Sequence, residues 1–148
     1  MNKKIMKKIT VFSISLMLLF LVGCNSNKKK EIDVSSIKIE GISLNSTKLW
    51  QANLETTDGV KKMQRIMHSF SDKENVVAYA SLKEELEVEF TIIFQKCTMK
   101  GEAHNQLHNF LKPMIAIFKG LESGNLKSCK VNFKTMENRL AGYTNYFE

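Results

Sequence analysis

Apolar residues beyond position 55 recur every three or four positions, the spacing that places side chains on one face of an α-helix. Four stretches show this spacing, and polar or glycine residues typical of helix ends separate them. The predicted helices span residues 58–70, 74–97, 102–121 and 126–147. Thr56, Thr57 and Asp58 are suited to cap the first of these helices and to form its acidic first turn. The 74–97 helix has the most continuous apolar stripe.

The last two predicted helices each carry a special feature. Pro113 lies inside the third pattern, where the missing backbone N–H predicts a kink or a lost hydrogen bond. The fourth helix has a narrow, coiled-coil-like seam of apolar side chains. That seam consists of Leu126, Cys129, Phe133, Met136, Leu140, Tyr143 and Phe147.

The chain before these helices has a different period. Apolar and polar residues mostly alternate over 32–44, which predicts one or two short extended segments with a turn at Glu40-Gly41. Leu49-Trp50 is expected to continue this run and to bring the single tryptophan to the core. Four amphipathic helices with short connections favour a mostly α fold, an antiparallel up-down four-helix bundle with a short extended N-terminal segment. The alternative is an α+β domain in which the N-terminal strands form a small sheet against the helices.

The first 24 residues form a unit of their own. Met1–Lys8 is basic, residues 9–22 are almost entirely apolar, and the run ends in Leu21-Val22-Gly23-Cys24. This order is typical of a secretory signal, and the apolar run is short for a spanning helix. The tetrapeptide resembles the lipobox of bacterial lipoproteins. The alternative is an uncut membrane anchor that ends in Gly-Cys by chance.

The resemblance to lipoproteins implies a defined mature chain. The Cys24 thiol would carry a diacylglyceryl group, and cleavage before Cys24 would remove the signal peptide 1–23. Residues 24–31 would form a lipidated tether and 32–148 a single helical domain outside the cytoplasm. Asn25, which is not Asp, would permit passage to the outer membrane of a two-membrane cell.

Removal of the signal changes the charge argument. The formal charge of +7 falls to about +3, because four lysines leave with the signal. No basic stripe interleaved with aromatic residues remains, so the sequence predicts no nucleic-acid partner. Lys28-Lys29-Lys30 follows the lipid and adds about 1 kcal/mol of attraction per charge to an anionic surface, or serves only as a solvated tether. The membrane is the expected partner, through Cys24, and a protein partner in the envelope stays open.

Candidate metal ligands cluster where the second and third predicted helices meet. His104 and His108 are four residues apart, the spacing by which one helix presents two imidazoles to a single metal. Cys97 and Met99 lie just before them, and Met63 is a further candidate because its helix begins at the same end of the bundle. Thiolate and thioether favour copper(I), and imidazole also suits zinc and copper(II). We therefore expect a soft or borderline metal, copper foremost.

Alternatives to a metal site stay open at this point. The histidines are also typical of a helix boundary, and methionines at helical spacing usually fill a core. A haem or an apolar molecule between helices is a further alternative. The segment 97–111 resembles a stretch of small uncharacterised bacterial envelope proteins, to which no activity is attached. His68 is expected on the surface.

Catalysis and a disulfide have less support. Cys97 and His104 resemble a nucleophile–base pair, but no glycine-rich phosphate loop or oxyanion-hole motif accompanies them. Cys97 and Cys129 are the two cysteines left after lipidation. In an up-down bundle they lie at opposite ends of a helix of about 30 Å, too far apart for a disulfide. The sequence therefore predicts two free thiols, and it favours a binding or structural protein over an enzyme.

Overall fold

A computed structural model describes residues 36–148, and this part of the chain is mostly helical, as predicted. The helices are α1 (Leu54–Ser69), α2 (Val76–Lys96), α3 (Gly101–Leu111), α4 (Met114–Leu121), α5 (Leu126–Ala141) and the 3₁₀ helix η2 (Gly142–Asn145). The signal peptide, Cys24 and the tether lie outside the described residues. None of the helices described is both long enough and apolar enough to span a bilayer.

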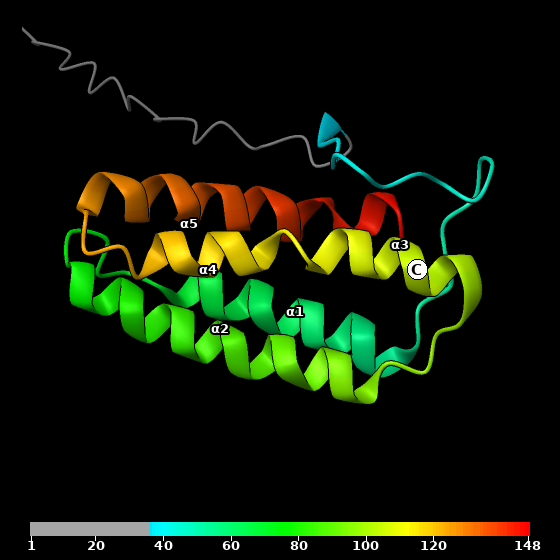
Figure 1. Cartoon of the computed structure of the whole chain (residues 1–148), viewed down its shortest axis with the longest axis horizontal. Helices are drawn as coiled ribbons and strands as arrows, with labels where there is room; N and C mark the ends of the chain where they lie inside the picture. The colour runs from blue at the N-terminus through cyan, green and yellow to red at the C-terminus, as the bar shows by residue number, and fades with distance from the viewer. Residues whose placement is uncertain (1–35) are drawn as a thin grey trace, which may run out of the picture. The chain divides into compact units, whose positions relative to one another are not determined.

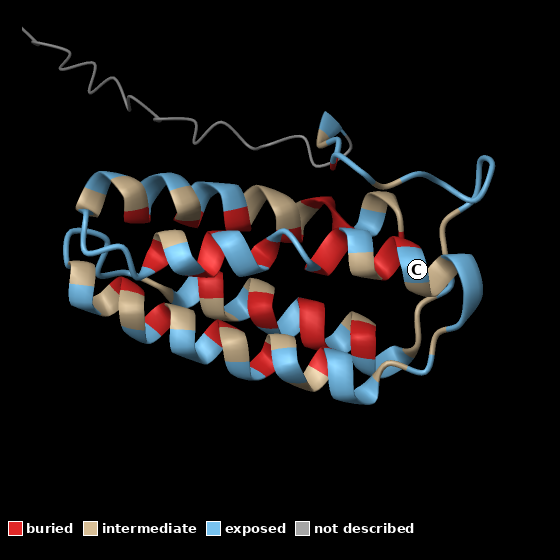
Figure 2. Ribbon diagram, viewed as in Figure 1, coloured by how far each residue is buried: buried red, intermediate tan, exposed pale blue. Residues whose placement is uncertain are grey.

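The helices form a bundle in which successive members run in opposite directions (Figure 1). Helices α3 and α4 together take the third position. Helix α1 packs against α2 and α5, and α4 packs against α2 and α5. Figure 2 shows the buried residues along the inward faces of the helices, as amphipathic helices require. The largest fully buried side chains include Tyr79, Leu86, Ile93, Phe110, Met114 and Met136.

Pro113 divides the third predicted helix into α3 and α4. A proline has no N–H to donate, so the carbonyl of Asn109 four residues earlier loses its helical partner. The Arg139 guanidinium on α5 donates to this carbonyl through Nη2 at 2.9 Å and to the Phe110 carbonyl through Nε at 2.7 Å. The predicted kink is therefore present, and a side chain from the neighbouring helix satisfies the carbonyls that it frees.

Helix α1 begins four residues before the predicted start at 58. Asn53 is its N-cap residue, and the Asn53 Oδ1 accepts a hydrogen bond of 2.8 Å from the Thr56 hydroxyl. The Asn53 Nδ2 also donates to the Lys96 carbonyl at the end of α2. Thr56 is therefore inside the helix and buried, and the prediction of it as a cap was wrong. Asn53 begins the helix because it also bonds the end of α2, a contact that the local sequence around Thr56 does not show.

The fourth predicted helix is also shorter than expected. Helix α5 ends at Ala141 and the chain continues as η2, so the prediction of one helix over 126–147 was wrong. Gly142 lies against the N-terminal segment, because a Cβ atom there would meet Ile39 Cδ1 at 2.7 Å. After η2 the chain pairs with Trp50: the Trp50 N–H donates to the Tyr146 carbonyl, and the Glu148 N–H donates to the Trp50 carbonyl. Tyr143 and Phe147 still lie on the buried seam, as predicted.

The described part of the N-terminal segment contains no strand. Its β-type contacts are isolated bridges, one between Asn45 and Lys48 and one between Trp50 and Phe147. Residues 37–44 therefore form a non-helical segment with the predicted turn at Glu40-Gly41, and without a strand the described residues do not support the α+β alternative. Trp50 packs against the core as predicted, and its Nε1 donates to the Ser43 carbonyl at 2.6 Å.

Candidate functional site

The candidate site lies at the end of the bundle where α2 gives way to α3. Cys97 directly follows α2, and residues 98–100 form the connection to α3. Gly101 has a φ of 60°, in the left-handed region that glycine adopts without a Cβ penalty. The chain therefore turns within four residues, and this brings the first turns of α3 back against the end of α2.

The turn brings Cys97 and His104 together. The Cys97 Sγ lies 3.6 Å from the His104 Nδ1, and both side chains are half-buried. A tetrahedral zinc with a sulfur ligand at about 2.3 Å and a nitrogen ligand at about 2.0 Å separates those two atoms by about 3.5 Å. An S–H to nitrogen hydrogen bond accounts for the same distance. The pair is therefore spaced to share either a proton or a metal ion.

His108 lies one helical turn from His104, as the four-residue spacing predicts. The two imidazole centroids are 4.3 Å apart, and the planes are tilted by 54°. His108 also packs on Phe94 in a T-shaped arrangement, with ring centroids 5.3 Å apart. Burial lowers the pKa of His108, and the charges of His104 and Lys112 lower this pKa further. The neutral imidazole, which is the form that binds metals, is therefore favoured.

The two methionines have different places in the structure. Met99 lies in the connection next to Cys97 and is partly buried against the core. Met63 is fully buried on α1. Its neighbour Lys62 pairs with Glu89 at 2.5 Å, and Glu89 precedes Cys97 by eight residues, or about 12 Å of helix. This pairing places the level of Met63 along the bundle about two helical turns from Cys97, so Met63 stays a less favoured candidate ligand.

A complete set of three ligands is not assembled as the side chains stand. Within residues 36–148 no group of three or more His, Cys, Asp or Glu side chains lies close enough to hold a metal ion. Cys97 and His104 are in place, and His108 would have to rotate toward them. His68, in contrast, is exposed near the end of α1, as predicted.

The carboxylates near the site serve the structure. Glu102 accepts hydrogen bonds from Asn105 and Gln106, and these bonds lower the pKa of the Glu102 carboxyl. The Gln106 Oε1 in turn accepts from the Ser43 backbone N–H at 2.9 Å. Glu102 thus stabilises the first turn of α3 and holds the N-terminal segment through Gln106. No contact between Glu102 and the Cys97 thiol is present among the described residues.

Phe94 is the neighbour of the site that the sequence did not predict. It lies off the main apolar stripe of α2, yet its ring packs on Phe90 as well as on His108. Phe94 precedes Cys97 by three residues, a spacing that places both on the same side of α2. This spacing could have predicted Phe94 as a neighbour of the site. Phe94 therefore gives the His108 imidazole an aromatic neighbour from α2.

Comparison with known proteins gave no match to a family model, to a curated protein or to a solved structure.

Proposed function

We propose that this chain is a lipid-anchored lipoprotein of the bacterial envelope whose helical domain binds a soft or borderline metal ion. Cys97, His104 and His108 are the ligands, and Met99 is a fourth candidate. Copper is the foremost metal, and zinc is the second. The lipid on Cys24 would hold the domain on the outer side of the cytoplasmic membrane or on the outer membrane.

The separation of 3.6 Å between the Cys97 Sγ and the His104 Nδ1 is the observation that supports this proposal. It is close to the sulfur–nitrogen separation in a tetrahedral metal site built from thiolate and imidazole, about 3.5 Å. The two donors come from the end of one helix and the first turn of the next, so packed helices hold both of them. Binding would therefore use this pair as it stands and would require His108 to turn toward it.

The donor set decides which metals are favoured. A thiolate and a thioether favour copper(I), whereas imidazole nitrogens also suit zinc and copper(II). Cys97, His104 and Met99 are all half-buried, so an ion bound there would keep access to solvent on one side. A half-open site at the end of a tethered bundle suits the capture or transfer of a metal better than a closed structural site does.

Metal binding is tested on the full chain purified in mild detergent. Competition titrations with copper(I) and zinc are expected to give about one ion per chain. A His104→Ala/His108→Ala double variant that still folds is expected to lose this ion. His68→Ala removes a histidine elsewhere on the surface and is the matched control, expected to bind as wild type does. Binding weaker than about millimolar, or equal binding by the double variant, would refute the metal proposal.

Anchoring is tested separately. Mass spectrometry of the mature N-terminus is expected to find an acylated Cys24, and Cys24→Ala is expected to leave an uncleaved or misplaced precursor. A mature chain that begins at another residue would refute the anchor without affecting the metal site. The same spectrum shows whether the Cys24 thiol is acylated. An acylated thiol cannot bind metal as a thiolate, so Cys24 would then not contribute to the titration.

The alternative function is a metal-free structural or interaction protein of the envelope. The Cys97–His104 contact is then only a hydrogen bond, in keeping with the lack of a third assembled ligand within residues 36–148. Apolar side chains remain exposed on α2 and α4, among them Val88, Phe94 and Ile115. Failure of the metal titration with an intact fold would favour this alternative.

A further inference from the structure

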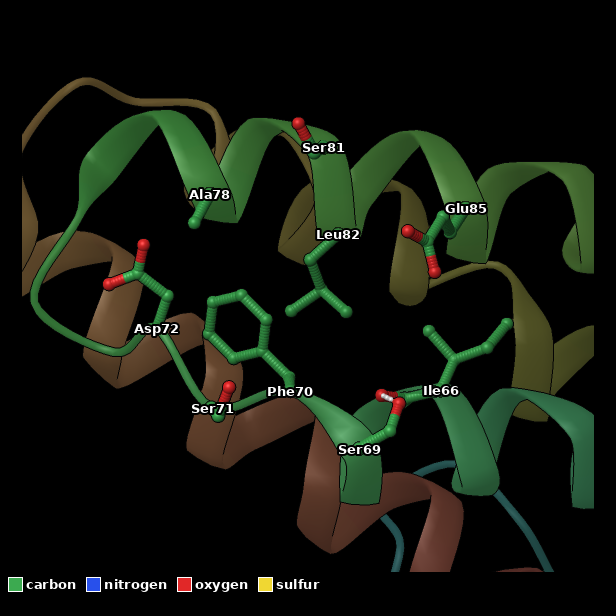
Figure 3. A pocket seen from close by; sticks show the side chains of 9 residues that line it. All are labelled: Ile66, Ser69, Phe70, Ser71, Asp72, Ala78, Ser81, Leu82 and Glu85. Atoms are coloured by element: carbon green, nitrogen blue, oxygen red, sulfur yellow. Dashed lines mark hydrogen bonds between the residues drawn. The ribbon is translucent and has the colours of Figure 1, made fainter.

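A groove lies between the end of α1 and the start of α2, at the end of the bundle away from Cys97. Its volume is about 350 Å³, within the range of small-molecule sites. Figure 3 shows Phe70 and Leu82 at its centre, with polar side chains around them. The Phe70 ring packs on Tyr79 and Phe133, with centroids 4.9 and 5.5 Å away, so the floor of the groove is held by the core.

The rim of the groove is acidic. Nine residues line it, and among these described residues Asp72 and Glu85 carry charge while no lysine or arginine is present. The Asp72 carboxylate accepts one hydrogen bond, from the Asn75 Nδ2 at 3.0 Å. Serine hydroxyls at positions 69, 71 and 81 complete the rim. A ligand of this groove would therefore be positively charged and would have an apolar part.

The two carboxylates lie at opposite ends of the apolar floor. Figure 3 shows Asp72 beside Ala78 at one end and Glu85 at the other end, with Phe70 and Leu82 between them. Ala78 and Glu85 are seven residues apart on α2, which is about 10 Å. Two carboxylates separated in this way cannot share one metal ion, whose oxygen ligands lie within about 2.6 Å of it. The spacing instead suits a ligand with two separate positive ends.

We propose that this groove binds a linear aliphatic diamine or polyamine. One ammonium group would pair with Asp72 and the other with Glu85, and the methylene chain would lie across Phe70 and Leu82. The apolar contact removes the methylene groups from water, and the two end charges select against neutral and anionic chains. This site does not depend on the metal site at Cys97.

Binding is tested on the full chain in detergent by two-dimensional NMR, with 1,5-diaminopentane as the probe. Its addition at millimolar concentration is expected to shift the amide signals of Ser81, Leu82 and Glu85. Pentylamine has one charge and is expected to bind more weakly, and 1,5-pentanediol has none and is expected not to bind. Salt is expected to weaken the binding of the diamine, because exposed ion pairs are screened.

Variants assign the interaction to the two carboxylates. Glu85→Gln and Asp72→Asn are each expected to weaken diamine binding about two- to fivefold, as the loss of an exposed ion pair does. Glu84→Gln removes a charge from the adjacent position outside the groove and is expected to change nothing. Asp72 also bonds Asn75, so if Asp72→Asn unfolds the chain, Glu85→Gln alone decides. Absence of the shifts, equal binding of pentylamine, or equal effects of the Glu84 and Glu85 variants would overturn the proposal.

Discussion

The Arg139 guanidinium donates hydrogen bonds to carbonyls that the Pro113 bend between α3 and α4 leaves without a backbone donor. Pro113 cannot donate to the Asn109 carbonyl, and the Arg139 Nη2 donates to it at 2.9 Å. The Arg139 Nε occupies the next free carbonyl, that of Phe110, at 2.7 Å. A residue on α5 thus compensates for a break between α3 and α4, and it links the bend to the C-terminal helix.

Arg139→Met is expected to lower the free energy of unfolding by about 1–3 kcal/mol, because it removes both hydrogen bonds and leaves the partly buried Phe110 carbonyl without a donor. Urea denaturation measures this loss, and Arg65→Met on an exposed face of α1 is the control. Pro113→Ala restores a backbone N–H for the Asn109 carbonyl, so Arg139→Met is expected to cost less in that background. Equal costs in the two backgrounds would contradict the compensation.

Gly59 permits the close approach of α1 to α2. A Cβ atom at this position would lie 2.4 Å from the Ile93 Cγ1, and Ile93 is fully buried. Gly59→Ala is therefore expected to destabilise the fold by about 1–3 kcal/mol, measured by thermal or urea unfolding. Lys61→Ala, on the exposed side of α1, is the control and should have little effect. If Gly59→Ala costs as much in an Ile93→Ala background as in the wild type, the steric explanation fails.

The ionisation of Tyr143 makes the stability of the fold depend on pH in the alkaline range. Burial raises the pKa of Tyr143 to about 12, and its hydrogen bond to Thr57 only partly offsets this effect. The folded chain therefore keeps the phenol proton above pH 10, where the unfolded chain loses it, and stability falls as the pH rises toward 12. Between about pH 8 and about pH 11.5 this group accounts for about 2 kcal/mol of lost stability.

Tyr143→Phe isolates this contribution, because lysines also titrate in the same range. The variant is expected to lose about 2 kcal/mol less than wild type over this pH interval, as measured by urea unfolding at both pH values. Tyr79, whose pKa burial also raises, remains in both proteins. An identical pH dependence of the two proteins would show that the phenol ionises as easily in the fold as outside it.

The two cysteines of the helical domain are expected to differ in reactivity. Both thiols are free in the structure, Cys97 half-buried at the end of α2 and Cys129 fully buried in the first turn of α5. The Cys129 thiol donates to the Leu121 carbonyl at 3.0 Å. Iodoacetamide is expected to alkylate Cys97 in the native protein and Cys129 only after unfolding, as read by peptide mass spectrometry. Recovery of a peptide with a 97–129 disulfide from native protein would contradict the topology.

The sequence predicted the parts of the fold that depend on local periodicity. The stripe from Tyr79 to Ile93 predicted α2 closely, and Pro113 predicted the bend. The predicted helix ends were wrong where contacts between residues far apart in the sequence determine them. Asn53 begins α1 because it also bonds the end of α2, and η2 replaces the last helical turns where Gly142 packs on Ile39.

The site was predicted in part for the same reason. The four-residue spacing of His104 and His108 and the short connection after Cys97 are local, so their proximity follows from the sequence. Whether Met63 reaches the site could not be predicted, because the longitudinal register of α1 and α2, set by contacts such as Lys62 with Glu89, cannot be read from either helix alone. Phe94 was missed because it faces the imidazole pair from the margin of its helix.

X-ray absorption at the metal edge tests the central claim most directly, with the full chain loaded with one equivalent of zinc or copper(I). For zinc we predict one sulfur neighbour at about 2.3 Å together with nitrogen neighbours at about 2.0 Å. Cys97→Ser should remove the sulfur signal, and His104→Ala/His108→Ala should remove the nitrogen signal, whereas His68→Ala should leave both unchanged. A spectrum with only oxygen neighbours, or a sulfur signal that survives Cys97→Ser in a chain whose Cys24 is acylated, would contradict the metal site.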